Sequence, residues 1–176
     1  MSVYHESIQV TSQGSEPTFI NITDEVKRCI AASKISQGIV AITSPHTTCA
    51  IYFDEFAHDL KENGTDYLQD DLNRCLSKIV PNQKDFPPDD GYQYPGEEHY
   101  RAVESWPNAD QYVPGGDRSQ LLNADAHIKA SILGSSEICS IVDSQLAFGV
   151  TGYLFFVDFD RTRSRQRTCH ITVIGE

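Results

Sequence analysis

The sequence predicts an α+β fold in which a largely antiparallel β-sheet packs against helices. Three observations support this class. Short runs rich in β-branched residues open the chain, segments with helical periodicity occupy its middle, and four strand-like runs follow one another toward its end. Because strands and helices do not alternate one by one, a parallel sheet built from βαβ units is not expected.

The first predicted elements surround one helix. Thr23 is expected to cap this helix, because acidic residues follow it in the first turn, where the helix dipole favours negative charge. Gly38 is expected to stop the helix. On either side, apolar or β-branched residues are spaced as in strands. The predicted strands in this part of the chain are 7–10, 18–22, 38–43 and 49–53.

Helical periodicity returns after the fourth predicted strand. Phe56 and Leu60 are expected to form a short helical face that is interrupted at 63–64. A longer helix is expected to restart at Thr65 and to end before Pro81, because its apolar residues recur at helical spacing. These apolar residues are Leu68, Leu72, Cys75, Leu76 and Ile79.

The segment 85–117 mixes prolines, glycines, aromatic residues and acids. This composition is too interrupted for a regular element and too aromatic for a plain linker. We therefore predict a long, ordered, acidic and aromatic-rich loop, of a length that is usually functional or disordered. Its acids and Arg101 are expected to form a solvated face. The loop is equally suited to cover a small-molecule site or to dock another protein.

The last part of the chain is predicted to contain one helix and then four strands. Asn123 is expected to cap the helix, Ile128 and Ile132 to share one face of it, and Gly134 to end it. The strands are predicted from runs of β-branched and aromatic residues. They span 137–142, 145–149, 153–159 and 168–174.

Length and composition predict one domain, 1–176, that is long enough to bury a core. Five cysteines without a CxxC motif favour reduced thiols over a disulfide framework or a zinc knuckle. No apolar run approaches the roughly 20 residues of a membrane-spanning helix, and the first residues lack a signal-peptide pattern. We expect a cytoplasmic protein. The formal net charge of −11 disfavours nucleic acid and anionic membranes as partners.

The first candidate site is the junction of two predicted strands, where His46, Thr47 and Thr48 follow Pro45. Such a turn would ordinarily carry glycine, asparagine or aspartate. The His46 ring is suited to act as a metal ligand, a general base or a donor to phosphate. The alternative is a structural histidine that is satisfied by a backbone carbonyl.

The second candidate site is the predicted helix that carries His127 between Asp125 and Lys129. Asp125 and His127 are two residues apart and do not share a helical face, so their pairing would need a contact across the fold or across a subunit boundary. After the helix, Ser135 and Ser136 follow a glycine. They are placed either to cradle a phosphate or to form a simple helix stop and turn.

Four arginines recur at every second position between two predicted strands: Arg161, Arg163, Arg165 and Arg167. In an extended strand they would point the same way and form a clamp for a diphosphate. The exposed face of a hairpin gives the same pattern, and we predict this arrangement for most of them, with one or two reaching a site.

Two further residues lie near these motifs. Glu55, after Asp54, is placed either to cap the following helix or to coordinate a cation. His99 lies in the long segment, from which it is positioned to fold over a site.

The segments "PHTTCAIYFDE" (45–55) and "NADAHIKASILGSS" (123–136) together resemble the two signature segments of the YjbQ-like family, also called the secondary thiamine-phosphate synthase family. The segments "QLAFGVTGYLFFVDFD" and "VIGE" are similar to C-terminal strands of that family. The resemblance implies an antiparallel α+β fold assembled as a homotrimer. It also implies that His46 and His127 converge near a subunit interface.

The sequence departs from the family pattern in three places. Asp54 and Glu55 stand where Asn-Glu is usual, the expected Tyr-Arg-His stretch has only "EEHYRA" and "YQY" as counterparts, and the segment 85–117 is longer than expected. The first departure retains an acid at Glu55. The other two leave a third histidine, for which His99 is the candidate, and the substrate open.

Two functions follow from the resemblance and the motifs. The first is a thiamine-phosphate synthase-like enzyme that joins a pyrimidine diphosphate to a thiazole phosphate. His46 and His127 would bind a divalent metal ion (zinc or magnesium) or donate to phosphate oxygens, and Glu55 or Asp125 would orient a histidine. The expected substrate-binding residues are Thr47, Thr48, Asn123, Lys129, Ser135 and Ser136. The alternative is a trimeric protein that binds a metal or a small phosphorylated molecule without turnover.

Overall fold

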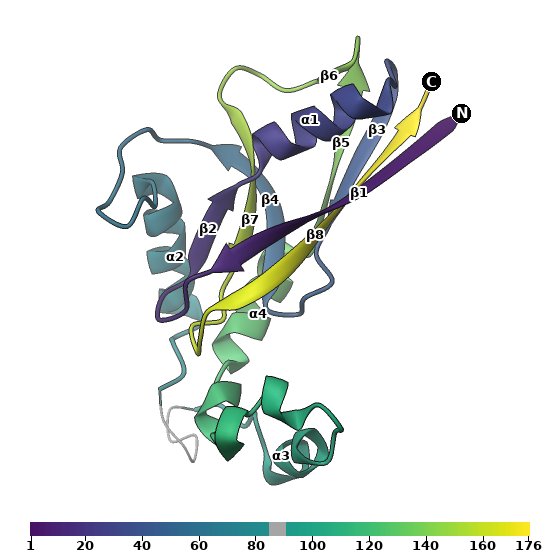
Figure 1. Cartoon of the computed structure of the whole chain (residues 1–176). Helices are drawn as coiled ribbons and strands as arrows, with labels where there is room; N and C mark the ends of the chain where they lie inside the picture. Colours follow the sequence, from purple (N-terminus) through teal and green to yellow (C-terminus); the bar gives the residue numbers. More distant parts are fainter. Residues whose placement is uncertain (85–90) are drawn as a thin grey trace.

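The computed structural model describes residues 1–84 and 91–176, and within them it confirms the α+β class (Figure 1). The strands are β1 (Ser2–Ser12), β2 (Thr18–Asn21), β3 (Gly38–Thr43), β4 (Cys49–Glu55), β5 (Ser136–Val142), β6 (Gln145–Leu146), β7 (Gly152–Asp158) and β8 (Arg165–Gly175). The helices are α1 (Thr23–Ser33), α2 (Tyr67–Ile79), α3 (Glu97–Glu104) and α4 (Ala124–Leu133). Three 3-10 turns, Ala109–Gln111, Pro114–Gly116 and Arg118–Leu121, connect α3 to α4.

The strands form two sheets in which all pairs are antiparallel. The larger sheet has the order β1-β8-β3-β5-β6, and the smaller has the order β2-β7-β4. β8 comes last among the strands in sequence, yet it lies between β1 and β3. The larger sheet is therefore complete only when the two ends of the chain meet.

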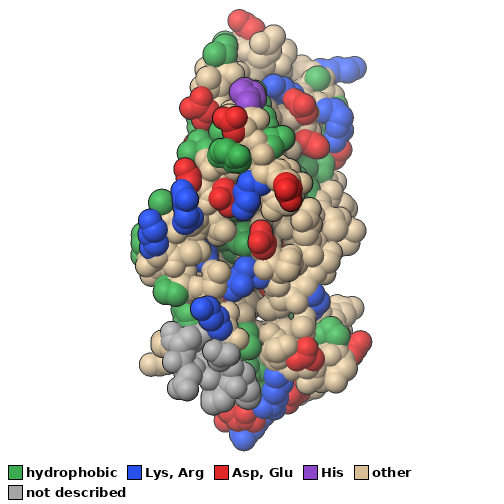
Figure 2. Space-filling view, turned by 90° about the vertical axis from the view of Figure 1, so that its left-hand side faces the viewer, with side chains coloured by type: hydrophobic (Ala, Val, Ile, Leu, Met, Phe, Trp, Pro, Cys, Tyr) green, Lys and Arg blue, Asp and Glu red, His purple; other side chains and the backbone are tan. Residues whose placement is uncertain are grey.

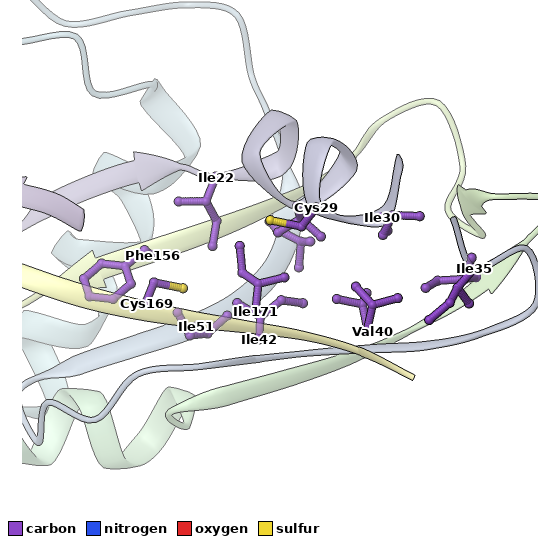
Figure 3. Close-up of a cluster of buried hydrophobic side chains, with 14 of the residues drawn as sticks. Ile22, Cys29, Ile30, Ile35, Val40, Ile42, Ile51, Phe156, Cys169 and Ile171 are labelled. Atoms are coloured by element: carbon purple, nitrogen blue, oxygen red, sulfur yellow. The ribbon is translucent and has the colours of Figure 1, made fainter. Parts of the chain in front are cut away.

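The main core lies between the two sheets and α1, which crosses the larger sheet in Figure 1. Figure 3 shows Cys29 and Ile30 of α1 facing Ile42 and Ile171 of the larger sheet. The helical spacing of Val26, Cys29 and Ile30 places these side chains together on the buried face of α1. This layer fixes the larger sheet, whose ends carry the side chains of the site.

The smaller sheet is covered on both faces. Leu154 and Phe156 of β7 join the main core, whereas Phe155 and Val157 pack toward α2 and α4 in a second cluster. A strand that is buried on both faces reads as a continuous apolar run instead of an alternating one. Burial on both faces explains why the sequence "YLFFV" shows no alternation with polar positions. The second cluster holds α4 beside β4 and β7.

Several predicted boundaries are corrected by the structure. Residues after β4 do not form the short helix expected around Phe56 and Leu60, because an isolated bridge joins Leu60 to Asp66 in extended conformation. The N-cap of α2 is Asp66 and not Thr65. Thr23 is the first residue of α1 and its hydroxyl accepts a hydrogen bond from the Leu154 amide, so it joins the helix to β7 instead of capping it.

The face of α4 that carries Ile128 and Ile132 is its solvent-exposed side. The buried face consists of alanines with two charged side chains. Its small residues allow α4 to approach β4 and β7 closely, and the charges find partners within the fold. The predicted strand at 145–149 is reduced to Gln145–Leu146.

The segment 85–117, predicted as a loop, contains helix α3 and the first two turns, and the third turn, Arg118–Leu121, follows directly. Residues 85–90 of that prediction lie outside the described residues. Four buried side chains form a small core of this part of the chain: Tyr100, Val103, Val113 and Leu121. Glu97, Glu98 and Arg101 are exposed and form ion pairs with one another, in agreement with the predicted solvated face. Figure 1 shows this segment below α4.

The face turned toward the viewer in Figure 2 carries acidic and basic side chains interspersed with apolar ones. The negative net charge is therefore not gathered into a single acidic field on this face. In the described part of the chain, no helix combines the length and apolar character that a bilayer crossing requires.

Candidate functional site: a histidine and arginine pocket

A pocket with a volume of about 320 Å³ lies where four parts of the chain meet. They are the β3–β4 turn, the start of α4, the start of β8, and residues 91–121, which contain α3 and are called the α3 segment below. The predicted residues His46, Thr47, Thr48, Asn123 and His127 line it together with His99. Both histidines of the two motifs therefore reach one pocket within a single chain. The remaining lining residues are Pro45, Tyr94, Val103, Trp106, Tyr112, Leu121, Asp160, Arg165 and Arg167.

His46 lies in the turn between β3 and β4 and completes the edge of the larger sheet. Pairing of β3 with β8 ends at Thr43 and His170, and the next outward amide of β8, that of Thr168, donates to His46 Nε2 at 2.8 Å. The His46 ring thus accepts from a backbone amide at Nε2, whereas the structural alternative supposed a ring that donates to a backbone carbonyl. This bond places the ring proton of the neutral imidazole on Nδ1.

The surroundings of both histidines favour the neutral imidazole. Burial, and then the nearby Arg167, lowers the pKa of His46. Burial also lowers the pKa of His127, while a hydrogen bond with the Thr47 backbone opposes this shift. Neutral rings offer one donor and one acceptor each, so these side chains are equipped to hold hydrogen bonds rather than a fixed positive charge.

Aromatic side chains line the pocket beside His127. The Tyr94 ring meets the His127 ring edge-on, with centroids 5.5 Å apart, and the Tyr94 hydroxyl lies 3.1 Å from His99 Nε2. Trp106 packs edge-on against Tyr112 at 5.1 Å on the α3 segment. The segment predicted as a possible cover therefore supplies aromatic side chains to the pocket.

The arginines do not form the exposed hairpin face that we predicted for most of them. Arg167 donates from Nε and Nη2 to both carboxylate oxygens of Asp158, at 2.7 and 3.2 Å, and both side chains are buried. Nη2 also donates to the Thr48 hydroxyl. β8 begins only at Arg165, so the four arginines do not share one strand.

The other arginines are directed differently. Arg165 forms an ion pair with Asp160, with Nη2 2.9 Å from Oδ2, and lines the pocket. Arg163 donates to the backbone oxygens of Tyr112 and Gln111 on the α3 segment. Arg161 contacts Asp125 on the far side of α4.

The Asp160 carboxylate has several hydrogen-bond and ion-pair partners. It accepts hydrogen bonds from Asn123 Nδ2 at 3.0 Å and from the backbone amide and hydroxyl of Thr162, and it forms an ion pair with Arg165. These donors lower its pKa against the opposing effect of burial. Asp158 and Asp160 together balance the charges of Arg165 and Arg167, so the pocket presents directed donors and not an excess of charge.

Asp125 and Lys129 do not reach the pocket. Lys129 is completely buried, and its Nζ donates to Asn82 Oδ1 at 2.6 Å and contacts Asp125 at 3.4 Å. Burial lowers the pKa of Lys129. Because helical residues that are two positions apart face different sides, His127 reaches the pocket while Asp125 contacts Arg161 and Lys129.

Glu55 is also remote from the pocket. It ends β4, six residues from Cys49, and a strand advances about 3.3 Å per residue, which separates the two ends by roughly 20 Å. Its side chain is exposed, and its carbonyl accepts from Gln69.

Ser135 lies in a second hollow of about 350 Å³, which shares His46 and Thr47 with the first. Gly134 and Ser131 line this hollow as well. Ser136 belongs to β5, pairs with Thr43 and lines neither hollow. Of the predicted "GSS" cradle, therefore, one serine is adjacent to the histidine turn.

A divalent metal ion at His46 and His127 stays a prediction. Among residues 1–84 and 91–176, no group of three or more histidine, cysteine or acidic side chains is placed to hold a metal. Nε2 of His46 is engaged by the Thr168 amide. Structural zinc takes four ligands and magnesium mostly oxygen atoms, whereas arginines flank these histidines.

Sequence reasoning missed Asp158, Asp160 and the aromatic residues of the α3 segment. The signal for the acids is the pattern "VDFDRTRSRQR", in which two acids and several arginines alternate across a turn. Acids and arginines this close together across a turn between two strands can pair with one another, as Asp158 does with Arg167 and Asp160 with Arg165.

Comparisons with known proteins match the whole chain. A family model described as UPF0047 protein YjbQ-like matches residues 6–176. A UPF0047 protein of Archaeoglobus fulgidus is 30% identical over 147 residues, which cover 84% of this chain and 85% of that protein. The UPF0047 protein YugU of Bacillus subtilis is 26% identical over 156 residues, with 89% of each covered.

Solved structures have the same fold. A YbjQ-like protein of unknown function from Sulfolobus solfataricus superposes with a TM-score of 0.68 at 23% identity, covering 99% of both chains. An uncharacterized conserved protein of the yjbq/upf0047 family from Clostridium acetobutylicum gives a TM-score of 0.64 at 27% identity, covering 95% of this chain and 99% of that one.

Proposed function

The chain belongs to the YjbQ-like UPF0047 family, and from this premise we propose that its histidine and arginine pocket binds a small phosphorylated molecule. The observation that carries the proposal is the convergence of His46, His127, Arg165 and Arg167 on one pocket. Imidazole and guanidinium N–H groups are strong donors to phosphate oxygens. A volume of about 320 Å³ suits a small ligand.

We propose further that the pocket supports a thiamine-phosphate synthase-like transfer. The thiazole nitrogen attacks the methylene carbon of the pyrimidine diphosphate, a carbon–nitrogen bond forms, and diphosphate leaves with the electrons of the broken carbon–oxygen bond. The ring nitrogen becomes cationic, so no proton is transferred. Neutral His46 and His127 therefore suffice as donors, and the Arg165 guanidinium adds a directed N–H donor to the oxygens of the departing diphosphate.

The test is product formation from hydroxymethylpyrimidine diphosphate and hydroxyethylthiazole phosphate, read as fluorescent thiochrome. Reactions without metal, with magnesium and with zinc separate the chain's own groups from a metal requirement. We expect His46→Ala to abolish the product and His58→Ala, at an exposed histidine outside the pocket, to leave it unchanged. Absence of product from the wild-type chain under every condition would reject this reaction.

The second candidate is binding without turnover. It is favoured by the fixed partners of the pocket side chains, since Arg167 is held by Asp158 and His46 by the Thr168 amide. Such side chains form a rigid framework that needs no rearrangement to hold a ligand. Saturable binding of either phosphorylated substrate, measured by calorimetry without any thiochrome signal, would select this candidate.

We also propose that the chain assembles as a homotrimer. The outward face of β3 and β5 exposes Ile39, Ile138 and Val142, with 40%, 67% and 48% of their surfaces accessible. These positions alternate with the buried positions of the same strands and so share one face. Contiguous exposed apolar surface of this kind is characteristic of protein interfaces.

A further inference from the structure

Two buried polar atoms of the pocket are left over after the internal hydrogen bonds are formed. Arg165 Nε and Asn123 Oδ1 have no hydrogen-bond partner in the part of the chain that the structure describes. Asn123 is 6% exposed, and the Arg165 side chain is 15% exposed. A buried donor or acceptor without a partner is costly, so atoms of this kind mark a place where an outside group completes the site.

The orientation of both groups is fixed by one oxygen. Asn123 Nδ2 donates to Asp160 Oδ2 at 3.0 Å, and Arg165 Nη2 contacts the same oxygen at 2.9 Å. Turning the Asn123 amide around would place its oxygen against the carboxylate, so Oδ1 is the free acceptor. Both side chains therefore contact the same carboxylate oxygen, and both line the pocket.

We infer that Arg165 and Asn123 form a paired subsite that binds two groups of the ligand, and this inference rests on the proposed phosphate binding. Arg165 Nε–H takes a phosphate oxygen, and Asn123 Oδ1 takes an N–H or O–H close to that phosphate. The ligand class is thus a phosphorylated alcohol or amine that carries a second, hydrogen-bond-donating group. A fully ionised phosphate alone is an acceptor and cannot satisfy Asn123 Oδ1.

The subsite predicts discrimination among phosphate esters of nearly equal size. Ethyl phosphate supplies only acceptors, whereas hydroxyethyl phosphate and aminoethyl phosphate add a donor to the same chain length. Because a site built for a donor leaves its acceptor unpaired when the donor is missing, the two donor-bearing esters should bind about tenfold more tightly.

Binding of the esters can be followed by the fluorescence of a tryptophan in the pocket. Trp106 is the one tryptophan in the sequence and lines the same pocket. Fluorescence titrations of the wild-type chain at about pH 8, where the phosphates are fully ionised, give the three dissociation constants. Equal affinity for all three esters overturns the paired subsite but leaves the proposed phosphate binding intact. Failure of every ester to bind overturns both.

Variants assign the two roles. In Asn123→Ala the advantage of the donor-bearing esters should disappear while ethyl phosphate still binds, and Arg165→Lys should weaken all three. Asn63→Ala and Arg74→Lys change the same residue types at exposed positions outside the pocket and should alter nothing. Retention of the donor preference in folded Asn123→Ala overturns the assignment.

If a variant fails to fold, the wild-type chain still decides the assignment. Nitrogen-resolved NMR of the Arg165 Nε–H should show a shift with each ester. An unshifted resonance under saturating ester overturns the role of Arg165.

Discussion

Arg167 is a buried cation whose position is set by a carboxylate and a hydroxyl. Its guanidinium spans both oxygens of Asp158 and reaches Thr48, which brings the ends of β7, β4 and β8 to one point. Relative to an apolar pair, a buried ion pair gives little net stability, but removal of one partner leaves the other charge unpaired. The pair therefore matters chiefly because neither member can be lost alone.

We expect Arg167→Met to lower the free energy of unfolding by about 3–5 kcal/mol, because Asp158 is then buried without its partner. Urea unfolding followed by circular dichroism measures the change. Arg74→Met is the control, since Arg74 pairs with Asp71 at an exposed position and should cost about 0–1 kcal/mol. Similar losses in both variants would contradict the buried-pair assignment.

The lowered pKa of His46 predicts a dependence of stability on pH. Its pKa lies below the ordinary 6.5, so the unfolded chain binds the proton more readily than the folded chain. Its contribution to stability is therefore present above pH 6.5 and is lost as the pH falls through 6.5 toward the lowered value.

We expect His46→Gln to lose less stability than wild type between about pH 7 and pH 5, because the glutamine oxygen still accepts from the Thr168 amide without titrating. Thermal unfolding across that range provides the comparison. His58→Gln, at an exposed position, should follow the wild-type curve. A His46→Gln curve parallel to wild type would show that another group governs the pH response.

At the scale of the element, α2 begins at a defined cap. The Asp66 carboxylate accepts from the amides of Leu68 and Gln69, each at 3.0 Å. The neighbouring Thr65, where the sequence pattern placed the start, is the last residue before the cap. The displacement by one residue follows from Asp66 having extended backbone angles and a side chain that closes back on the first turn.

Asp66→Ala should cost about 1 kcal/mol in the free energy of unfolding, because two amides of α2 lose their acceptor. Thr65→Ala should change it little. Both values come from the midpoints of urea unfolding at unchanged slope. A larger loss in Thr65→Ala than in Asp66→Ala would contradict the assignment of Asp66 as the cap.

The α3 segment is joined to the rest of the molecule through Arg163. This side chain donates to the Tyr112 and Gln111 backbone and to the Gln120 side chain. Arg163→Ala should loosen the segment and expose Trp106 further to water, shifting its fluorescence to longer wavelength. Arg101→Ala, within the exposed ion pairs of α3, is the control and should leave the emission unchanged. An unshifted spectrum in Arg163→Ala would show that the segment is held by other contacts.

At the scale of the whole molecule, the exposed β3–β5 face decides assembly. Ile138→Lys should convert the proposed trimer to monomers, because it places a charge on an apolar interface. Light scattering after size-exclusion chromatography measures the mass. Ile79→Lys changes an equally exposed isoleucine at the end of α2 and should not alter it. A monomeric wild-type chain would reject the trimer.

The antiparallel α+β fold was predictable because its signals are local. β-branched runs fix the strands at 38–43 and 49–53, and the stripe from Leu68 to Ile79 fixes α2. α3 was missed because the composition around it suggested a loop, although Gly96 followed by Glu97 and Glu98 is a helix start. In α3, the acids of the first turn and the buried side chains of Tyr100 and Val103 favour the helix despite the prolines around it.

The site was predictable only in part. His46 and His127 stood out because polar rings interrupt apolar or β-branched surroundings. The partners of the arginines depend on how the turn between β7 and β8 closes, and so on contacts that no local pattern contains. The orientation of Asp125 likewise depended on Lys129 and Arg161, which compete for its carboxylate.

The position of β8 in the larger sheet affects when the pocket forms during folding. β1 pairs with β8 across a sequence separation of 163 residues at Ser7 and His170, and long-range pairing of this kind slows folding. β8 also delivers Arg165, Arg167 and the amide that holds His46. The pocket therefore does not exist in any intermediate that lacks β8, and ligand binding should return during refolding together with the final kinetic phase.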